Sequence, residues 1–180
     1  TVSNVSRAED GQTSLRMDMV EQVIVNIERM QHEIWDSTLD PAIVIAMRDI
    51  PRHEFVPEKL RPFSYFDIPL PVGYAQNTSQ PYLIALMTQL AGVDKNNRVF
   101  ETGTGSGYHA AILSRFAARV FSVEVVKPLA NSAARRLEKM GYTNIEVRHA
   151  DGFYGWKERG PFDALIIKEA LSTSSSPADA

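Results

Sequence analysis

The sequence predicts a single α/β domain built on a mostly parallel sheet with helices on both faces. Short apolar segments of strand type alternate with segments of helical length over residues 98–167. This alternation is typical of parallel strands joined by right-handed crossovers. Three glycines, at positions 103, 105 and 107, directly follow the first of these strands. Ligands of such sheets bind beyond the carboxyl ends of the strands, so the glycine turn marks a candidate site.

The composition is that of an ordinary globular protein. The 180 residues carry a net charge of −3, are 44% hydrophobic and include no cysteine. Without a basic block, we expect neither nucleic acid nor an anionic membrane as a partner. No apolar run reaches the roughly 18 residues that a spanning helix needs. The lack of cysteine excludes disulfides and thiol chemistry. We expect a cytoplasmic protein with no metal site.

Two helices are predicted near the N-terminus. Residues 1–16 are polar, and we expect a disordered leader there. A helix follows over residues 17–30, because apolar side chains recur at helical spacing, namely Val20, Val23, Ile24 and Ile27. The second helix begins after Asp40, which suits the N-cap, and ends before Pro51. Five prolines then predict a structured loop over residues 51–74.

Four polar residues, Gln76, Asn77, Thr78 and Ser79, lead into a third predicted helix. Pro81 suits its first turn and Gly92 its end. One interpretation is that Ser79 or Gln80 caps this helix and that the other polar residues serve the turn. The alternative is that these side chains face a ligand.

The remaining elements belong to the sheet and its crossovers. The predicted strands cover residues 99–100, 119–124, 144–148 and 162–167, and the predicted helices cover residues 106–117 and 128–140. We therefore divide the single domain into an N-terminal helical and loop region (17–92), a core of alternating strands and helices (93–167) and a polar tail (168–180).

The glycine turn has the spacing Glu101-x-Gly103-x-Gly105-x-Gly107. In the dinucleotide-binding pattern G-x-G-x-x-G the third glycine comes three residues after the second, where this chain has Tyr108. This difference disfavours a dehydrogenase. A strand-to-helix turn without a ligand is the simplest alternative, but such a turn needs one glycine and not three. The spacing favours a nucleotide-type cofactor other than a dinucleotide.

Two acidic positions mark the ends of the next strands. Glu124 lies about 20 residues beyond the glycine turn, where α/β cofactor folds place the acid that binds ribose hydroxyls. Asp151 and Gly152 follow the third strand. The carboxyl ends of parallel strands share one edge of the sheet, so we expect these residues to meet the glycine turn there.

Several segments together resemble the protein-L-isoaspartate O-methyltransferase family. They are Pro51-Arg-His-Glu-Phe-Val-Pro57, Pro69-Leu-Pro-Val-Gly73, Gln76-Asn-Thr-Ser-Gln-Pro81, Glu101-Thr-Gly-Thr-Gly-Ser-Gly-Tyr108, Asp151-Gly152 and Gly160-Pro-Phe-Asp-Ala164. The glycine motif alone resembles motif I of S-adenosylmethionine-dependent methyltransferases. The T-S-Q-P segment at its distance before that motif narrows the resemblance to this one family.

The resemblance implies a Rossmann-like methyltransferase fold, S-adenosylmethionine as cofactor and damaged proteins or peptides containing isoaspartyl residues as substrates. It implies methyl esterification of the free carboxylate of L-isoaspartyl and D-aspartyl residues, which starts repair through a succinimide. By the same resemblance Ser79 is the catalytic residue. The implied cofactor-binding residues are Gln76, Asn77, Thr78, Glu101, Thr102, Gly103, Thr104, Gly105, Gly107, Glu124, Asp151 and Gly152.

The C-terminal segment departs from the family pattern. After residues 164–167 the family continues with small uncharged residues, a helix and three more strands, whereas this chain reads Lys168-Glu169 and then a Ser-rich stretch. We therefore expect a C-terminally truncated member whose strand 162–167 is an apolar sheet edge. We expect this form to bind the cofactor weakly and to methylate poorly. The alternatives are a remnant without activity and a methyltransferase that acts on small molecules.

Overall fold

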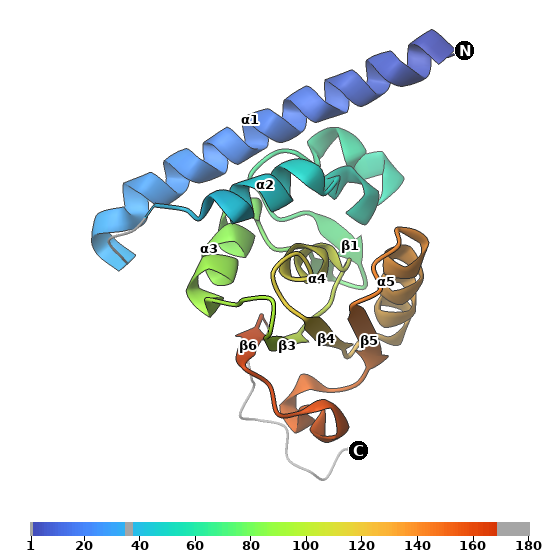
Figure 1. Ribbon diagram of the computed structural model, residues 1–180. Helices are drawn as coiled ribbons and strands as arrows, with labels where there is room; N and C mark the ends of the chain where they lie inside the picture. Colours follow the sequence, from blue (N-terminus) through green and yellow to red (C-terminus); the bar gives the residue numbers. More distant parts are fainter. Residues whose placement is uncertain (1, 35–37, 169–180) are drawn as a thin grey trace.

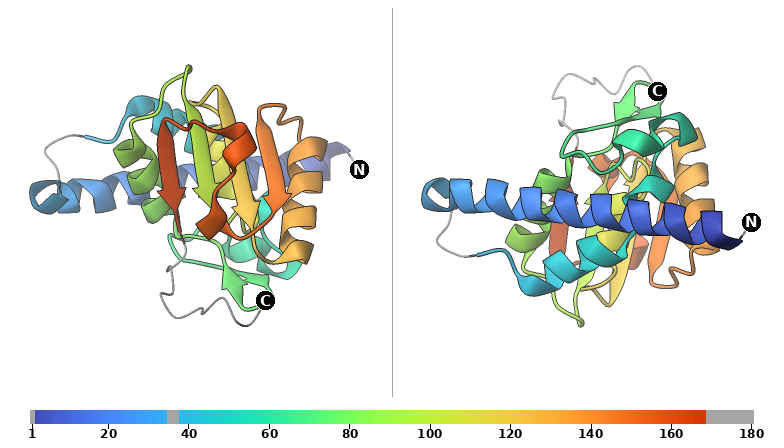
Figure 2. Two further views of the ribbon diagram at one scale, coloured as in Figure 1. Left: turned by 90° about the horizontal axis from the view of Figure 1, so that it is seen from below. Right: turned by 90° about the horizontal axis from the view of Figure 1, so that it is seen from above.

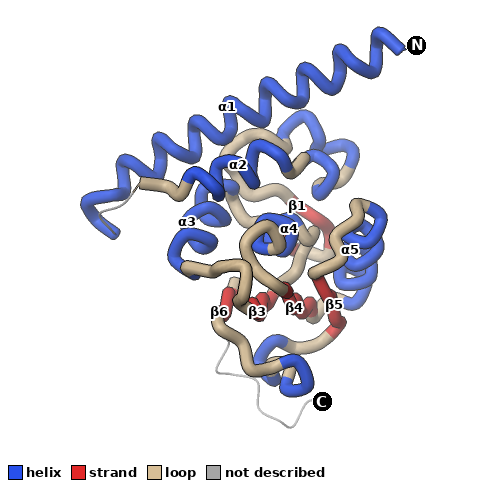
Figure 3. Tube along the Cα trace, viewed as in Figure 1, coloured by secondary structure: helices blue, strands red, loops and turns tan. Residues whose placement is uncertain are grey.

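Four parallel strands form the central sheet. The computed structural model describes residues 2–34 and 38–168, and the side chains of 11–29 and 38–168. The sheet has the order β5-β4-β3-β6 (Figures 1 and 3). Its strands are β3 (Arg98–Thr102), β4 (Arg119–Glu124), β5 (Ile145–His149) and β6 (Ala164–Ile167). All three pairings are parallel, so the predicted mostly parallel sheet is confirmed.

The two faces of the sheet are covered differently. The helices α3 (Pro81–Ala91), α4 (Tyr108–Leu113) and α5 (Lys127–Lys139) lie on one face (Figures 1 and 2). The other face carries the connection from β5 to β6, whose helical parts are the single-turn 3-10 helices η3 (Gly152–Tyr154) and η4 (Lys157–Arg159). A small aromatic core joins that connection to the sheet, formed mainly by Phe100, Phe121, Trp156 and Phe162.

A third layer, made of α1 (Val2–Ile34) and α2 (Pro41–Asp49), packs on α3 (Figure 2). The predicted apolar stripe of α1 is confirmed, because Val20, Val23 and Ile27 are buried in the main core. The predicted disordered leader over residues 1–16 is wrong, since the helix already begins at Val2. Extending a helix that packing has nucleated costs far less than starting one, and this stretch contains no proline.

The starts of α2 and α3 are capped in different ways. Asp40 caps α2 as predicted, because its Oδ1 accepts a hydrogen bond of 2.7 Å from the Ala42 N–H. The interpretation that Ser79 or Gln80 caps α3 is wrong. Gln80 occupies the N-cap position without a side-chain hydrogen bond to the helix. Asp67, distant in sequence, accepts instead from the Tyr82 N–H at 2.8 Å, which frees the segment before α3 for another role.

The proline-rich loop contributes more to the core than predicted. It contains the 3-10 helices η1 (Arg52–Phe55) and η2 (Glu58–Phe63) and leads into a small hairpin of β1 (Pro71–Gly73) and β2 (Gln76–Asn77). Arg52 and Phe55 are almost completely buried, 0% and 1% exposed. The loop therefore connects the N-terminal helices to the segment that contains Ser79.

Helix α4 ends at Leu113, four residues earlier than predicted. Beyond it the backbone tightens, because the N–H groups of Arg115 and Phe116 bond three residues back. The Asn144 side chain then donates to the Ser114 and Ala117 carbonyl oxygens, at 2.9 and 3.2 Å. These bonds satisfy the end of the helix and turn the chain toward β4.

Strand β6 is an edge of the sheet, as predicted, within the residues that the structure describes. Ile166 is buried, whereas Leu165 and Ile167 on the opposite face are 60% and 51% exposed. The predicted polar tail lies outside the described residues except for Lys168, so its conformation stays a prediction.

Candidate functional site

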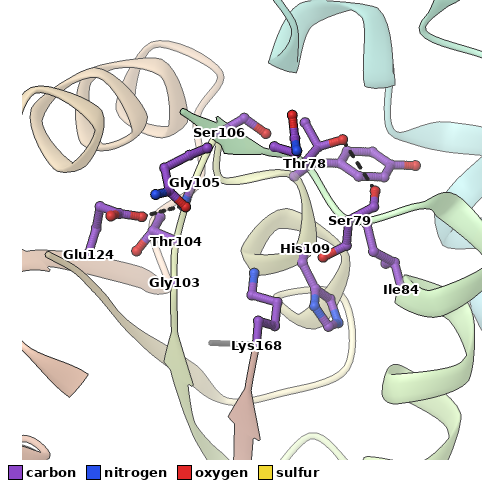
Figure 4. A pocket seen from close by; sticks show the side chains of 13 residues that line it. Thr78, Ser79, Ile84, Gly103, Thr104, Gly105, Ser106, His109, Glu124 and Lys168 are labelled. Carbon is purple, nitrogen blue, oxygen red and sulfur yellow. Dashed lines mark hydrogen bonds between the residues drawn. The ribbon is translucent and has the colours of Figure 1, made fainter. Parts of the chain in front are cut away.

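A polar cavity lies beyond the carboxyl ends of β3 and β4. It encloses about 530 Å³ of space, part of which is open to solvent. The glycine turn after β3 forms one wall, and the segment between β2 and α3 forms the other (Figure 4). The lining residues are Gln76, Asn77, Thr78, Ser79, Ile84, Gly103, Thr104, Gly105, Ser106, Tyr108, His109, Glu124 and Lys168.

The glycine turn is held to β4 by short hydrogen bonds. The Thr104 N–H donates to the Val123 carbonyl oxygen at 3.1 Å, and the Thr104 and Ser122 hydroxyls are 2.6 Å apart. Gly105 has a φ of +55°, which favours glycine, and no atom lies within 4 Å of where its Cβ would be. The turn therefore presents bare backbone to the cavity at this position.

Gly107 makes room for a neighbouring helix. Its φ is +89°, and a Cβ there would lie 3.1 Å from Leu137 Cδ1 of α5. It does not line the cavity. This glycine lets α5 pack closely against the start of α4, and its predicted contact with a cofactor stays a prediction.

Glu124 ends β4 and faces the cavity while remaining only 2% exposed. Its Oε2 accepts from the Gly105 N–H at 2.8 Å and its Oε1 from the Val126 N–H at 2.9 Å. Each carboxylate oxygen can accept a second hydrogen bond. Glu124 thus shapes the glycine turn and still offers acceptor capacity to a ligand in the cavity (Figure 4).

The opposite wall is held in place by Arg52. Its guanidinium donates to the carbonyl oxygens of Ser64, Ile68 and Ser79, at 2.9, 3.2 and 3.3 Å. It also donates to the Thr78 hydroxyl at 2.8 Å and lies 5.2 Å from the centre of the Tyr108 ring. One fully buried cation therefore organises the backbone around Ser79, the predicted catalytic residue.

Beneath the cavity floor, Glu101 is completely buried. Its Oε2 accepts from the Ser122 hydroxyl at 2.5 Å, and its Oε1 lies 2.7 Å from the Lys168 Nζ. Lys168 directly follows β6, and its side chain is 11% exposed. Figure 4 shows Lys168 extending beside the His109 ring. The predicted cofactor residue Glu101 is thus covered from the cavity side by an ion pair.

His109 is neutral and leaves an acceptor without a partner. Burial, and to a lesser degree the Lys168 ammonium, holds the pKa of His109 well below its ordinary value. The Thr88 hydroxyl donates to the Ile84 carbonyl oxygen at 2.7 Å and therefore accepts from His109 Nε2, 3.1 Å away. The proton is then on Nε2. Nδ1 is a buried acceptor without a hydrogen-bond partner among the described residues.

The predicted site residues divide into two groups. Those that line the cavity are Gln76, Asn77, Thr78, Ser79, Gly103, Thr104, Gly105 and Glu124. Those that do not are Glu101, Thr102, Gly107, Asp151 and Gly152. Asp151 lies close to this edge, since the adjacent Ala150 N–H donates to the Glu124 carbonyl oxygen at 3.1 Å. Its own Oδ1 accepts from the Phe153 N–H at 2.9 Å.

Gly152 packs under the end of β3. A Cβ at Gly152 would come within 2.6 Å of Thr102 Cγ2, so only glycine fits this approach. Its role here is to bring the connection after β5 onto the sheet.

The sequence prediction missed five lining residues, namely Ile84, Ser106, Tyr108, His109 and Lys168. Ser106, Tyr108 and His109 directly adjoin the glycine motif at the start of α4, and this adjacency is the signal that points to them. Ile84 lies in the first turn of α3, near Ser79. In the sequence Lys168 stands out only as a departure from the family pattern, and no local pattern indicates that Glu101 is its partner.

The described residues contain no cluster of three or more side chains that would hold a metal ion. Within the same residues, no helix is both long and apolar enough to cross a membrane.

Comparisons with known proteins agree on one family. The sequence profile described as Protein-L-isoaspartate(D-aspartate) O-methyltransferase matches residues 22–175. Protein-L-isoaspartate O-methyltransferase 2 of Syntrophobacter fumaroxidans is 44% identical over 173 residues, which are 96% of this chain and 70% of that protein. The protein of the same name from Nitrosococcus oceani is 45% identical, over 82% of this chain and 67% of its own length.

Solved structures give the same result. A protein-L-isoaspartate O-methyltransferase structure matches with a TM-score of 0.67 and 31% identity, over 82% of this chain and 47% of its own. A Plasmodium falciparum protein described as such an enzyme, in complex with S-adenosyl-L-homocysteine, matches with a TM-score of 0.62 and 22% identity, over 81% of this chain and 71% of its own. The chain thus spans about half the length of the first structure and roughly 70% of the two relatives above.

Proposed function

Because this chain belongs to the protein-L-isoaspartate(D-aspartate) O-methyltransferase family, we propose that it methylates isoaspartyl residues itself. Members of this family are S-adenosylmethionine-dependent enzymes. The reaction would esterify the free carboxylate of L-isoaspartyl and D-aspartyl residues in damaged proteins and start repair through a succinimide. The observation that carries this proposal is the single cavity that joins the glycine turn, Glu124 and Ser79.

The chemistry of the cavity lining suits a nucleoside-type cofactor. Glu124 offers acceptor capacity of the kind that ribose hydroxyls need, and the bare backbone at Gly105 permits close approach. The buried His109 Nδ1 lies 3.7 Å from Glu101 Oε1 behind this wall. These features support S-adenosylmethionine as the cofactor, with Gly103, Thr104, Gly105 and Glu124 as contacts.

The other proposed cofactor contacts act at the margins of the cavity. Gln76, Asn77 and Thr78 would hold the cofactor from the hairpin side. Asp151 and Gly152 adjoin the Glu124 end, where an adenine ring would lie beyond the ribose. We propose that Glu101, Thr102 and Gly107 act indirectly, by fixing the shape of the glycine turn.

The residues around Ser79 suit the positioning of an anion. Bound S-adenosylmethionine supplies an electrophilic methyl group on a sulfonium sulfur. A substrate carboxylate is ionised near neutral pH, so the protein does not need a general base. The role left to this chain is to hold the carboxylate in line and to exclude water from it. The Ser79 hydroxyl can donate to that carboxylate, while Arg52 fixes the Ser79 backbone.

Substitution of Ser79 tests this role. We expect Ser79→Ala to lower kcat/KM for an isoaspartyl peptide by about 10- to 100-fold, the worth of one hydrogen bond to a charged group. Cofactor affinity should stay unchanged, because the hydroxyl is assigned to the acceptor. Transfer of labelled methyl to isoaspartyl and matched aspartyl peptides measures the rate and the specificity, and calorimetric titration measures the affinity.

The matched control is Ser132→Ala, a serine of α5 outside the cavity. This substitution should leave both kcat/KM for the isoaspartyl peptide and the affinity for the cofactor unchanged. A methylated or acylated Ser79 trapped during turnover would show that this serine is a nucleophile, contrary to the proposal. Absence of methyl transfer to the isoaspartyl peptide by the unmodified chain would overturn the proposed activity.

A second candidate function is ligand binding without methyl transfer. The ion pair of Lys168 and Glu101 favours it, because it places charge where the resembled family has small uncharged residues. Stoichiometric cofactor binding without transfer to any isoaspartyl peptide would select this candidate. The cytoplasmic location expected from the sequence stays a prediction, as does the absence of nucleic-acid and membrane partners.

A further inference from the structure

Two charged side chains, Glu124 and Lys168, line the cavity, and a third, Glu101, lies directly beneath it. Lys168 neutralises Glu101 at 2.7 Å, and both members of this pair are almost completely removed from solvent. His109, which adjoins the pair, is uncharged for the reasons given above. The net charge of the wall formed by Glu101, Lys168 and His109 therefore depends on whether Lys168 is present.

The location of Lys168 makes that charge relevant to a ligand. The residue directly follows β6, and its Nζ reaches the cavity between the end of β3 and the start of α4 (Figure 4). Because both side chains of this pair are buried, their electrostatic interactions are screened less than those of surface charges. The affinity of the cavity for a ligand with an additional positive charge will therefore depend on whether the Lys168 ammonium is present.

We propose that Lys168 is a specificity-determining residue that shifts the preference of the cavity from the cationic methyl donor toward its neutral thioether product. The proposal rests on the proposed function, in which the cavity binds S-adenosylmethionine. That cofactor carries a sulfonium charge, and S-adenosylhomocysteine lacks it but is otherwise alike. A comparison of the two ligands therefore isolates the effect of a single charge.

The expected direction follows from the charge of the pair. With Lys168 present, the pair of Lys168 and Glu101 is neutral and gives the sulfonium no net attraction. Without the lysine, the buried Glu101 carboxylate attracts the donor more than the product. The Lys168–Glu101 pair of the unmodified chain is therefore expected to lower the affinity for the donor relative to that for the product.

Four forms of the chain provide the test, namely the unmodified protein, K168M, E101Q and the double variant E101Q/K168M. Titration calorimetry, at protein concentrations suited to weak binding, gives the dissociation constants of S-adenosylmethionine and S-adenosylhomocysteine for each form. Thermal melting of each form verifies that it is folded. K139M, which alters an exposed lysine at the end of α5, is the matched control.

We expect K168M to raise the ratio of donor affinity to product affinity by about tenfold or more, as one uncompensated charge in a partly buried site implies. E101Q should lower this ratio, because it leaves the lysine unpaired. The double variant restores a neutral wall, so its ratio of donor affinity to product affinity should be close to that of the unmodified protein. K139M should also have the ratio of the unmodified protein.

The outcomes separate the inference from the function on which it rests. Equal ratios in all five proteins, with both ligands bound, would overturn the role of Lys168 and leave the proposed function intact. A double variant that behaves like K168M would also refute it, because the effect would not follow net charge. If neither ligand binds any of the proteins, the cofactor assignment itself fails, and the inference fails with it.

Discussion

The fully buried Arg52 provides a sharp test of how this fold supports its candidate site. The guanidinium makes four hydrogen bonds, to three backbone carbonyl oxygens and the Thr78 hydroxyl. The described residues place no carboxylate within ion-pair distance of it. Its replacement by alanine leaves these acceptors buried without a donor and opens a cavity beside the Tyr108 ring.

We expect Arg52→Ala to lower the free energy of unfolding by about 3–5 kcal/mol. Each lost hydrogen bond contributes about 1 kcal/mol net, and acceptors left unsatisfied in the interior add to the loss. Arg52→Lys retains the charge but not the planar fork, and so should lose a smaller part of this stability. In that milder variant, KM for the peptide should rise more than the dissociation constant of the cofactor, because the arginine holds the Ser79 wall.

Denaturant unfolding measures the stability change, as a shift of the midpoint at constant slope. Arg48→Ala is the control, because Arg48 pairs with Glu21 at 2.6 Å on the exposed side of α2, and such pairs contribute less than about 1 kcal/mol. A loss at Arg52→Ala no larger than that of the control would refute the view that Arg52 organises this wall. So would an unchanged KM in Arg52→Lys.

Two further predictions follow from the glycine turn and from the buried histidine. Gly107→Ala should destabilise the chain by about 1–2 kcal/mol, since the residue has a left-handed φ and the new Cβ would press on Leu137. Thermal unfolding measures this loss, and wild-type stability in Gly107→Ala would contradict the packing role. For His109 the folded pKa lies well below the ordinary 6.5, so at acidic pH the unfolded chain takes up a proton that the folded chain does not. The stability due to neutral His109 is therefore complete above pH 6.5 and is lost progressively as the pH falls below it. His109→Gln should flatten this part of the pH–stability curve, and an equally steep curve in that variant would count against the assignment.

Local sequence signals predicted much of the fold. Asp40 and Pro41 mark the start of α2, and Gly92 marks the end of α3, where its φ is +56°. Such signals depend on backbone groups within one turn of the helix, so a single sequence contains all the information they need. The alternation of strands and helices over residues 98–167 is also readable from a single sequence, because each element shows its own hydrophobic period.

Errors arose where the deciding contact lies far away in the chain. The capping of α3 depends on Asp67, and the end of α4 on Asn144, and neither is within the helix it affects. The early start of α1 was missed for a related reason. Polar residues suggested a leader, whereas the packed turns around Val20 and Val23 nucleate a helix that then extends toward the N-terminus.

By itself the sequence determined the class of fold and the glycine turn of the candidate site, because the alternation of strands and helices and the spacing of the glycines are short-range patterns. Only the tertiary structure decided which side chains control that site. Arg52 reaches Ser79 across 27 positions, and Lys168 reaches Glu101 across 67. A buried charge takes its partner from whatever the fold brings within hydrogen-bond distance, and no local pattern encodes that choice.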